Sequence, residues 1–66
     1  MKDKNGKVIK EGDSVHAGLY LCVAEMNQGR LKLRVPEMIT KMTGRLYYEI
    51  HEFDPINIEV IERKEA

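Results

Sequence analysis

A strict alternation of charged and apolar side chains between Arg30 and Val35 constrains the fold of this chain more than any other feature. Three basic residues alternate there with three apolar ones, Leu31, Leu33 and Val35. On an extended backbone the apolar side chains all fall on one side, whereas a helix would scatter them around its circumference. The segment is therefore predicted to be a half-buried β-strand.

Two later segments repeat this pattern. From Leu46 to His51 the inward set is predicted to be Leu46, Tyr48 and Ile50, with Phe53 continuing it, and Tyr47 points outward. After a turn at Asp54-Pro55, a further strand is predicted to place three residues on one face: Ile56, Ile58 and Val60. Both segments favour strands that cover one shared apolar interior.

The segment from Leu19 to Met26 is apolar on both faces. Leu19, Leu21 and Val23 alternate with Tyr20, Cys22 and Ala24, which predicts a strand that is central or covered on both sides. Asn27, Gln28 and Gly29 then connect it to the alternating strand at Arg30. These two strands are predicted to form a β-hairpin.

Glycine, asparagine and proline mark the remaining boundaries. Asn5-Gly6 predicts a two-residue hairpin turn, and Glu11-Gly12-Asp13 predicts a second turn before Val15. Pro36 ends a strand because it has no N–H to donate. The following residues, 37–43, suit either one short helical turn or an irregular loop closed by Gly44.

These elements predict one mostly β domain over residues 1–66, with a frayed charged tail at 63–66. Five short antiparallel strands in so small a chain must close or pair their sheet, which favours a small SH3-like barrel with a short helical turn near residues 37–43. The alternative is an α+β fold in which the segment from Met38 to Met42 forms a helix on one sheet. A chain of 66 residues has a thin core, so dimerisation would enlarge it.

The first strand-and-turn pattern also carries a family resemblance. The stretch from Lys2 to Val15, KDKNGKVIKEGDSV, resembles a segment of YopX-type proteins of phages and prophages. Its Gly-Asp-x-Val ending, Gly12 to Val15, is similar to the entry into a strand in SH3-like and KOW-like small barrels. The resemblance covers about a fifth of the chain and implies a phage or prophage accessory protein, with no catalytic residue carried over.

Composition narrows the function classes. Eleven basic residues balance eleven acidic ones, so net charge gives no general attraction to nucleic acid or membranes. A single cysteine, a polar start and the lack of a long apolar run predict a cytoplasmic protein with no membrane partner, in the host cell if a phage encodes it.

Catalytic and metal chemistry find little support in the sequence. His16, His51 and Cys22 lack the clustered spacing of a metal site, and Cys22 is predicted to be a small buried residue within a strand. Phosphate-binding and nucleophile-elbow motifs are absent from the sequence. We therefore expect no enzyme activity, no metal and no cofactor.

Two surface hypotheses remain. The first is a protein-binding module that also self-associates, with four candidate contact residues: Tyr20, Tyr47, Met38 and Met42. The alternative is nucleic-acid binding by a basic strand face with one outward aromatic residue: Arg30, Lys32, Arg34, Lys41, Arg45 and Tyr47. Against this alternative, the basic middle of the chain could be neutralised by the acidic segment from Glu49 onward, which carries six acids and two basic residues.

Overall fold

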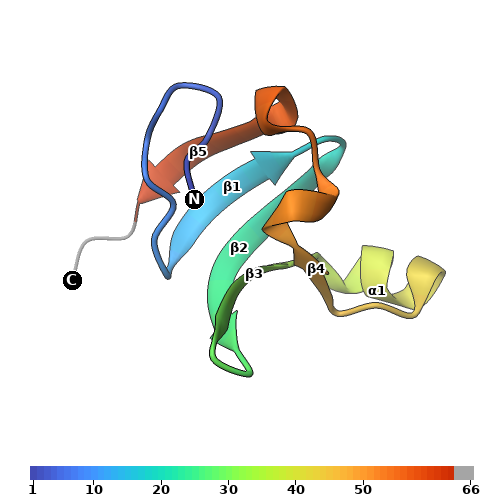
Figure 1. Cartoon of the computed structure of the whole chain (residues 1–66). Helices are drawn as coiled ribbons and strands as arrows, with labels where there is room; N and C mark the ends of the chain where they lie inside the picture. Colours follow the sequence, from blue (N-terminus) through green and yellow to red (C-terminus); the bar gives the residue numbers. More distant parts are fainter. Residues whose placement is uncertain (64–66) are drawn as a thin grey trace.

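The computed structural model describes the backbone of residues 1–63 and the side chains of residues 1–61. In this part of the chain one curved antiparallel sheet contains five strands (Figure 1): β1 Asp13–Ala17, β2 Tyr20–Asn27, β3 Arg30–Arg34, β4 Tyr47–Glu49 and β5 Ile58–Arg63. Their order is β4-β3-β2-β1-β5, so β2 is central and β4 and β5 form the two edges. The predicted mostly β fold with five antiparallel strands is confirmed.

Two tight hairpins set the register of the three middle strands. Gln28 and Gly29, with φ of 53° and 76°, connect β2 to β3 and bring Asn27 opposite Arg30. Positive φ at both central residues is typical of the type I′ turn, whose twist matches that of the two strands it connects. Gly18, with φ of 60°, begins the turn from β1 to β2, and Leu19 lies at its tip with 95% of its surface exposed. The prediction that Leu19 lies within the strand is therefore wrong.

The N-terminal segment makes a hairpin of a different kind from the predicted one. Lys2 pairs with Val8, and the Gly6 N–H donates to the Asp3 carbonyl at 3.0 Å. The Asp3 N–H in turn donates to the Lys7 carbonyl, so three residues separate the paired ends. Gly6 has φ of 79°, as a type I turn followed by a glycine bulge requires. The expected two-residue turn at Asn5-Gly6 is thus a three-residue loop.

A short helix, α1 Glu37–Thr43, connects β3 to β4, so the helical alternative for residues 37–43 is confirmed. Pro36 precedes its first turn, and Gly44, with φ of 76°, ends it by donating its N–H to the Thr40 carbonyl. None of the seven α1 residues is buried, although Ile39 packs partly against the core. In Figure 1 the helix extends past the end of the sheet rather than covering one of its faces. This position differs from the helix-on-sheet arrangement of the α+β alternative.

Among the residues whose side chains are described, the core consists of ten buried apolar residues: Ile9, Val15, Ala17, Cys22, Ala24, Leu33, Val35, Ile50, Ile58 and Val60. Cys22 and Ala24 of β2 belong to this core and have no exposed surface. On the other face of β2, Leu21 and Val23 are 54% and 40% exposed. Of the two alternatives predicted for this strand, the central position is confirmed. Its second face is partly exposed rather than covered.

Residues 46–57 contain less strand than the alternation predicts. β4 is three residues long, and two 3₁₀ turns follow it: η1 Ile50–Glu52 and η2 Pro55–Asn57. Ile50 is buried from η1 as expected, but Leu46 and Ile56 are 42% and 72% exposed, against the prediction that both point inward. Leu46 precedes β4 and Ile56 lies within η2, so the period of two does not apply to either residue.

The last strand runs further than expected. β5 pairs with β1 as far as Arg63 opposite Asp13, so the first residue of the predicted tail belongs to the sheet. Residues 64–66 of that tail lie outside the described residues.

Candidate interaction surfaces

Two candidate contact residues share one exposed face of α1. Met38 and Met42 are 71% and 76% exposed and lie one helical turn apart, so their side chains point the same way. The Lys41 ammonium lies 3.5 Å from the Glu37 carboxylate along the neighbouring face. Methionine is flexible and polarisable, which suits it to contacts with an apolar partner surface.

Tyr20, a third candidate, belongs to an aromatic cluster against the core. Its ring lies 5.9 Å from that of Tyr48 and 6.5 Å from that of Phe53, the latter edge to face. All three rings pack against the buried apolar residues. Tyr20 therefore packs against the core, on the same face of β2 as the buried Cys22 and Ala24.

Tyr47, the fourth candidate, is half-buried and bound through its hydroxyl. That hydroxyl donates to the Glu25 carboxylate at 3.1 Å, and the same carboxylate lies 3.4 Å from the Arg34 guanidinium. Partial burial and the contact with Glu25 raise the pKa of Tyr47. The four candidates thus divide into two exposed methionines and two tyrosines with partners inside the fold.

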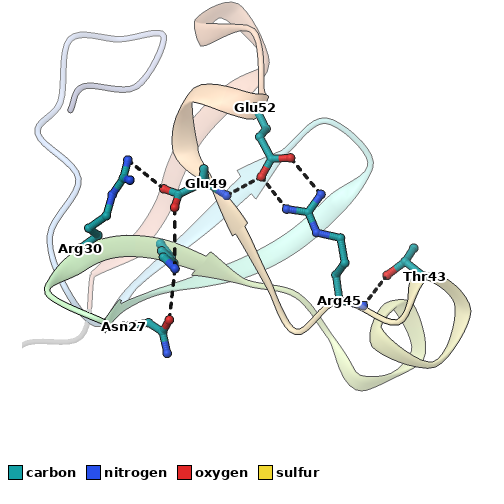
Figure 2. A network of polar contacts seen from close by, with 7 residues as sticks. Asn27, Arg30, Thr43, Arg45, Glu49 and Glu52 are labelled. Atoms are coloured by element: carbon teal, nitrogen blue, oxygen red, sulfur yellow. Dashed lines mark hydrogen bonds and ion pairs between the residues drawn. The ribbon is translucent and has the colours of Figure 1, made fainter.

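The basic residues of β3 meet acidic partners on neighbouring strands. The Glu49 carboxylate of β4 lies 3.3 Å from the Arg30 guanidinium and 3.7 Å from the Lys32 ammonium (Figure 2). The Lys32 ammonium also donates to the Asn27 side chain at 3.2 Å. Lys32 and Glu49 are cross-strand neighbours in the sheet register, so the alternation that places them on the same face of the sheet also pairs them.

Arg45 and Glu52 form the most complete ion pair in the described part of the chain. Two guanidinium nitrogens donate to the two carboxylate oxygens at 2.9 and 2.7 Å, and the Glu49 N–H donates to the same carboxylate at 2.7 Å (Figure 2). The guanidinium also lies 4.0 Å above the Tyr48 ring. Arg45, followed by the Glu49 N–H, lowers the pKa of Glu52 to about 2, and Glu52 raises the pKa of Arg45.

All five basic residues of the nucleic-acid alternative therefore have a carboxylate partner. Their partners are, in chain order, Glu49, Glu49, Glu25, Glu37 and Glu52. A phosphate backbone attracts cations whose charge is not already neutralised. These pairs count against a strongly basic face, and nucleic-acid binding stays a prediction.

One apolar surface, on the outer face of β2, was not predicted from the sequence. Leu21 and Val23 line a groove of about 390 Å³ together with Pro36 and Glu37 at the start of α1. Arg34 and Glu25 lie at its polar border. The signal for this surface was present, since apolar residues occupy both faces of β2, but it was interpreted as burial.

The remaining reactive side chains lie apart. His16 and His51 are exposed, and among the described residues there is no cluster of three His, Cys, Asp or Glu side chains able to hold a metal ion. Burial raises the pKa of the Cys22 thiol to about 11, so it stays protonated at neutral pH. A protonated thiol is a poor nucleophile.

The comparisons with known proteins place this small, mostly β domain in no family. No family model matches the chain, and no curated protein or solved structure is significantly similar to it. Within residues 1–63 no helix has the length and apolar character needed to cross a membrane.

Proposed function

We propose that this protein is a non-enzymatic interaction module that binds another protein through α1. The observation that carries the proposal is the helix itself, which extends from the sheet (Figure 1). Its residues Met38 and Met42 are exposed on one face. An amphipathic helix with apolar side chains at positions i and i+4 fits a hydrophobic groove on a partner. The sheet holds both ends of the helix, because β3 leads into it and β4 follows it.

The finer identity of the module is part of the same proposal. The resemblance of residues 2–15 to YopX-type proteins supports an accessory protein of a phage or prophage that acts in the host cytoplasm. The strand number and the curved sheet support an SH3-like barrel. In this proposal Tyr20 and Tyr47, the other two candidate residues, stabilise the domain that presents the helix.

The test replaces the two methionines by aspartate and uses the tagged protein as bait in a lysate of the organism that encodes it. We expect M38D/M42D to retain about a tenth or less of any protein that the unaltered chain binds, because two central apolar contacts are lost. A matched control, L19D/I56D, adds the same two charges at exposed apolar residues outside α1. Equal capture by M38D/M42D and the unaltered chain would contradict the proposal.

A further inference from the structure

The Asn5-Gly6 turn at the tip of the N-terminal hairpin combines the features that deamidation of asparagine requires. Both residues are exposed, and the side-chain amide of Asn5 makes no hydrogen bond within the described part of the chain. A Cβ added at Gly6 would meet no atom within 4 Å, so the turn is open on that side. Asparagine is a thermolabile residue, and a following glycine leaves the next backbone nitrogen sterically accessible.

We infer that Asn5 is a site of spontaneous modification to isoaspartate, and that this change detaches the N-terminal hairpin from β5. The Gly6 backbone nitrogen attacks the side-chain carbonyl carbon of Asn5 and forms a new C–N bond. The amide C–N bond breaks, and ammonia leaves with the proton that the Gly6 nitrogen loses. Water then hydrolyses the cyclic succinimide at either carbonyl, which gives aspartate or isoaspartate. In isoaspartate the backbone runs through the former side chain and contains an additional carbon atom.

The other two asparagines of the chain lack this setting. Asn27 is half-buried, and its side-chain oxygen accepts a hydrogen bond from the Lys32 ammonium at 3.2 Å. Asn57 is exposed but precedes the buried Ile58, whose β-branched side chain crowds the backbone nitrogen. The modification should therefore be selective for Asn5.

The reactive turn is coupled to β5 through one buried carboxylate. Asp3 accepts the N–H groups of Asn5 and Lys7 on one oxygen, at 2.9 and 2.8 Å, and the Val60 N–H on the other oxygen at 2.9 Å. An additional backbone carbon after residue 5 changes the spacing of the two loop donors, and the free carboxylate of isoaspartate adds a negative charge beside Asp3. Loss of these contacts leaves the Val60 N–H on an uncovered strand edge.

The same loop restrains the reaction while it is closed. The Gly6 N–H donates to the Asp3 carbonyl at 3.0 Å, so the attacking nitrogen becomes available when the loop opens. Asp3→Ala removes the carboxylate that holds the loop, and we expect it to accelerate deamidation of Asn5 by about fivefold, since opening then breaks fewer hydrogen bonds. Asp54→Ala, which removes an exposed carboxylate far along the chain, should leave the rate unchanged. An unchanged rate in Asp3→Ala would overturn the coupling.

Peptide mapping tests the modification itself. The full chain is incubated at mildly alkaline pH and cut with a glutamate-specific protease, which places each asparagine in a separate peptide: residues 1–11, 26–37 and 53–59. We expect the mass increase of amide-to-acid conversion in peptide 1–11 alone, as two isomers that separate by chromatography. Asn5→Ser should show no increase there. An unmodified peptide 1–11, under conditions that convert the same residues as a synthetic peptide, would overturn the inference.

Hydrogen exchange tests the structural consequence in the purified isoaspartate form. The Val60 amide should exchange about tenfold faster or more than in the unaltered chain, whereas the Glu49 amide at the other sheet edge stays unchanged. Asn5→Asp carries the added charge without the additional backbone carbon, so it should accelerate Val60 less. Equal exchange at Val60 in the isoaspartate form and the unaltered chain, or in the isoaspartate form and Asn5→Asp, would overturn the detachment by the altered backbone.

Discussion

The two edges of the sheet use the same chemical group in different surroundings. At the β5 edge the Asp3 carboxylate accepts the Val60 N–H at 2.9 Å, and at the β4 edge the Glu52 carboxylate accepts the Glu49 N–H at 2.7 Å. Asp3 is 5% exposed, whereas the Glu52 side chain is 31% exposed. In each case a side-chain oxygen takes the place that a neighbouring strand would otherwise occupy.

At the β5 edge, the carboxylate belongs to the N-terminal hairpin, which is itself attached to the strand. Asp3 also accepts the N–H groups of Asn5 and Lys7 at 2.9 and 2.8 Å, so one buried side chain organises the N-terminal loop and fixes it to β5. The Lys4 N–H adds a backbone bond to the Ile58 carbonyl at 2.8 Å. These hydrogen bonds lower the pKa of Asp3, the contact with Val60 contributing most.

The β4 edge has one side chain in front of it. The Leu46 carbonyl accepts the Val35 N–H, and backbone groups alternate sides along a strand, so the Glu49 N–H points away from β3. Glu52 covers that N–H and is fixed by Arg45. The comparison teaches that an exposed strand edge can be blocked by a local ion pair as well as by additional backbone, at a smaller expected gain in stability.

Asp3→Asn should have the largest effect on this comparison. The amide loses the charge that three N–H groups share and cannot present two acceptor oxygens, so the melting temperature should fall by about 10 °C. Amide hydrogen exchange should accelerate at Asn5, Lys7 and Val60. Asp54→Asn is the matched control, because Asp54 also accepts a backbone N–H, from Ile56 at 3.3 Å, but is exposed. Equal melting temperatures for the two variants would contradict a special role for Asp3.

Glu52→Gln should have an intermediate effect that depends on pH. At neutral pH the variant should melt about 3–6 °C below the unaltered chain, since the ion pair is partly exposed. The folded pKa of Glu52 is depressed, so its stabilisation is complete above its ordinary value of 4.5 and is lost as the pH falls towards about 2. Melting curves of the two proteins should therefore converge between these pH values. A constant difference down to pH 2 would show that Glu52 does not act through its charge.

The sequence predicted those parts of the fold that depend on local backbone preference and side-chain alternation. The hairpin of β2 and β3 and the five strands follow from spacing, proline and glycine, and the helical turn at 37–43 is one of the two alternatives that those residues left open. Alternation failed at Leu46 and Ile56, where 3₁₀ turns or a strand end interrupt the period of two. Spacing alone contains no information on where an extended segment stops being a strand.

The candidate site was less predictable, because partners come from distant parts of the chain. Exposure of Met38 and Met42 depends on the direction of α1, which only the packing of the whole domain sets. The link from Asp3 to Val60 joins residues 57 positions apart, and neither residue type indicates the other. Both faces of β2 are apolar in the sequence, and only the structure shows that the Leu21–Val23 face is uncovered in the described chain.

Arg45→Lys should have the smallest effect and shows how much of the β4 edge depends on arginine geometry. Lysine keeps the charge but cannot donate two parallel hydrogen bonds to Glu52 or place a planar group over Tyr48, so the melting temperature should fall by only about 1–3 °C. Hydrogen exchange at the Glu49 amide should accelerate while exchange at the Val60 amide stays unchanged, because Asp3 closes that edge independently. Acceleration at both amides would mean that the two edges open together, and the contrast between a local and an extended closure would then fail.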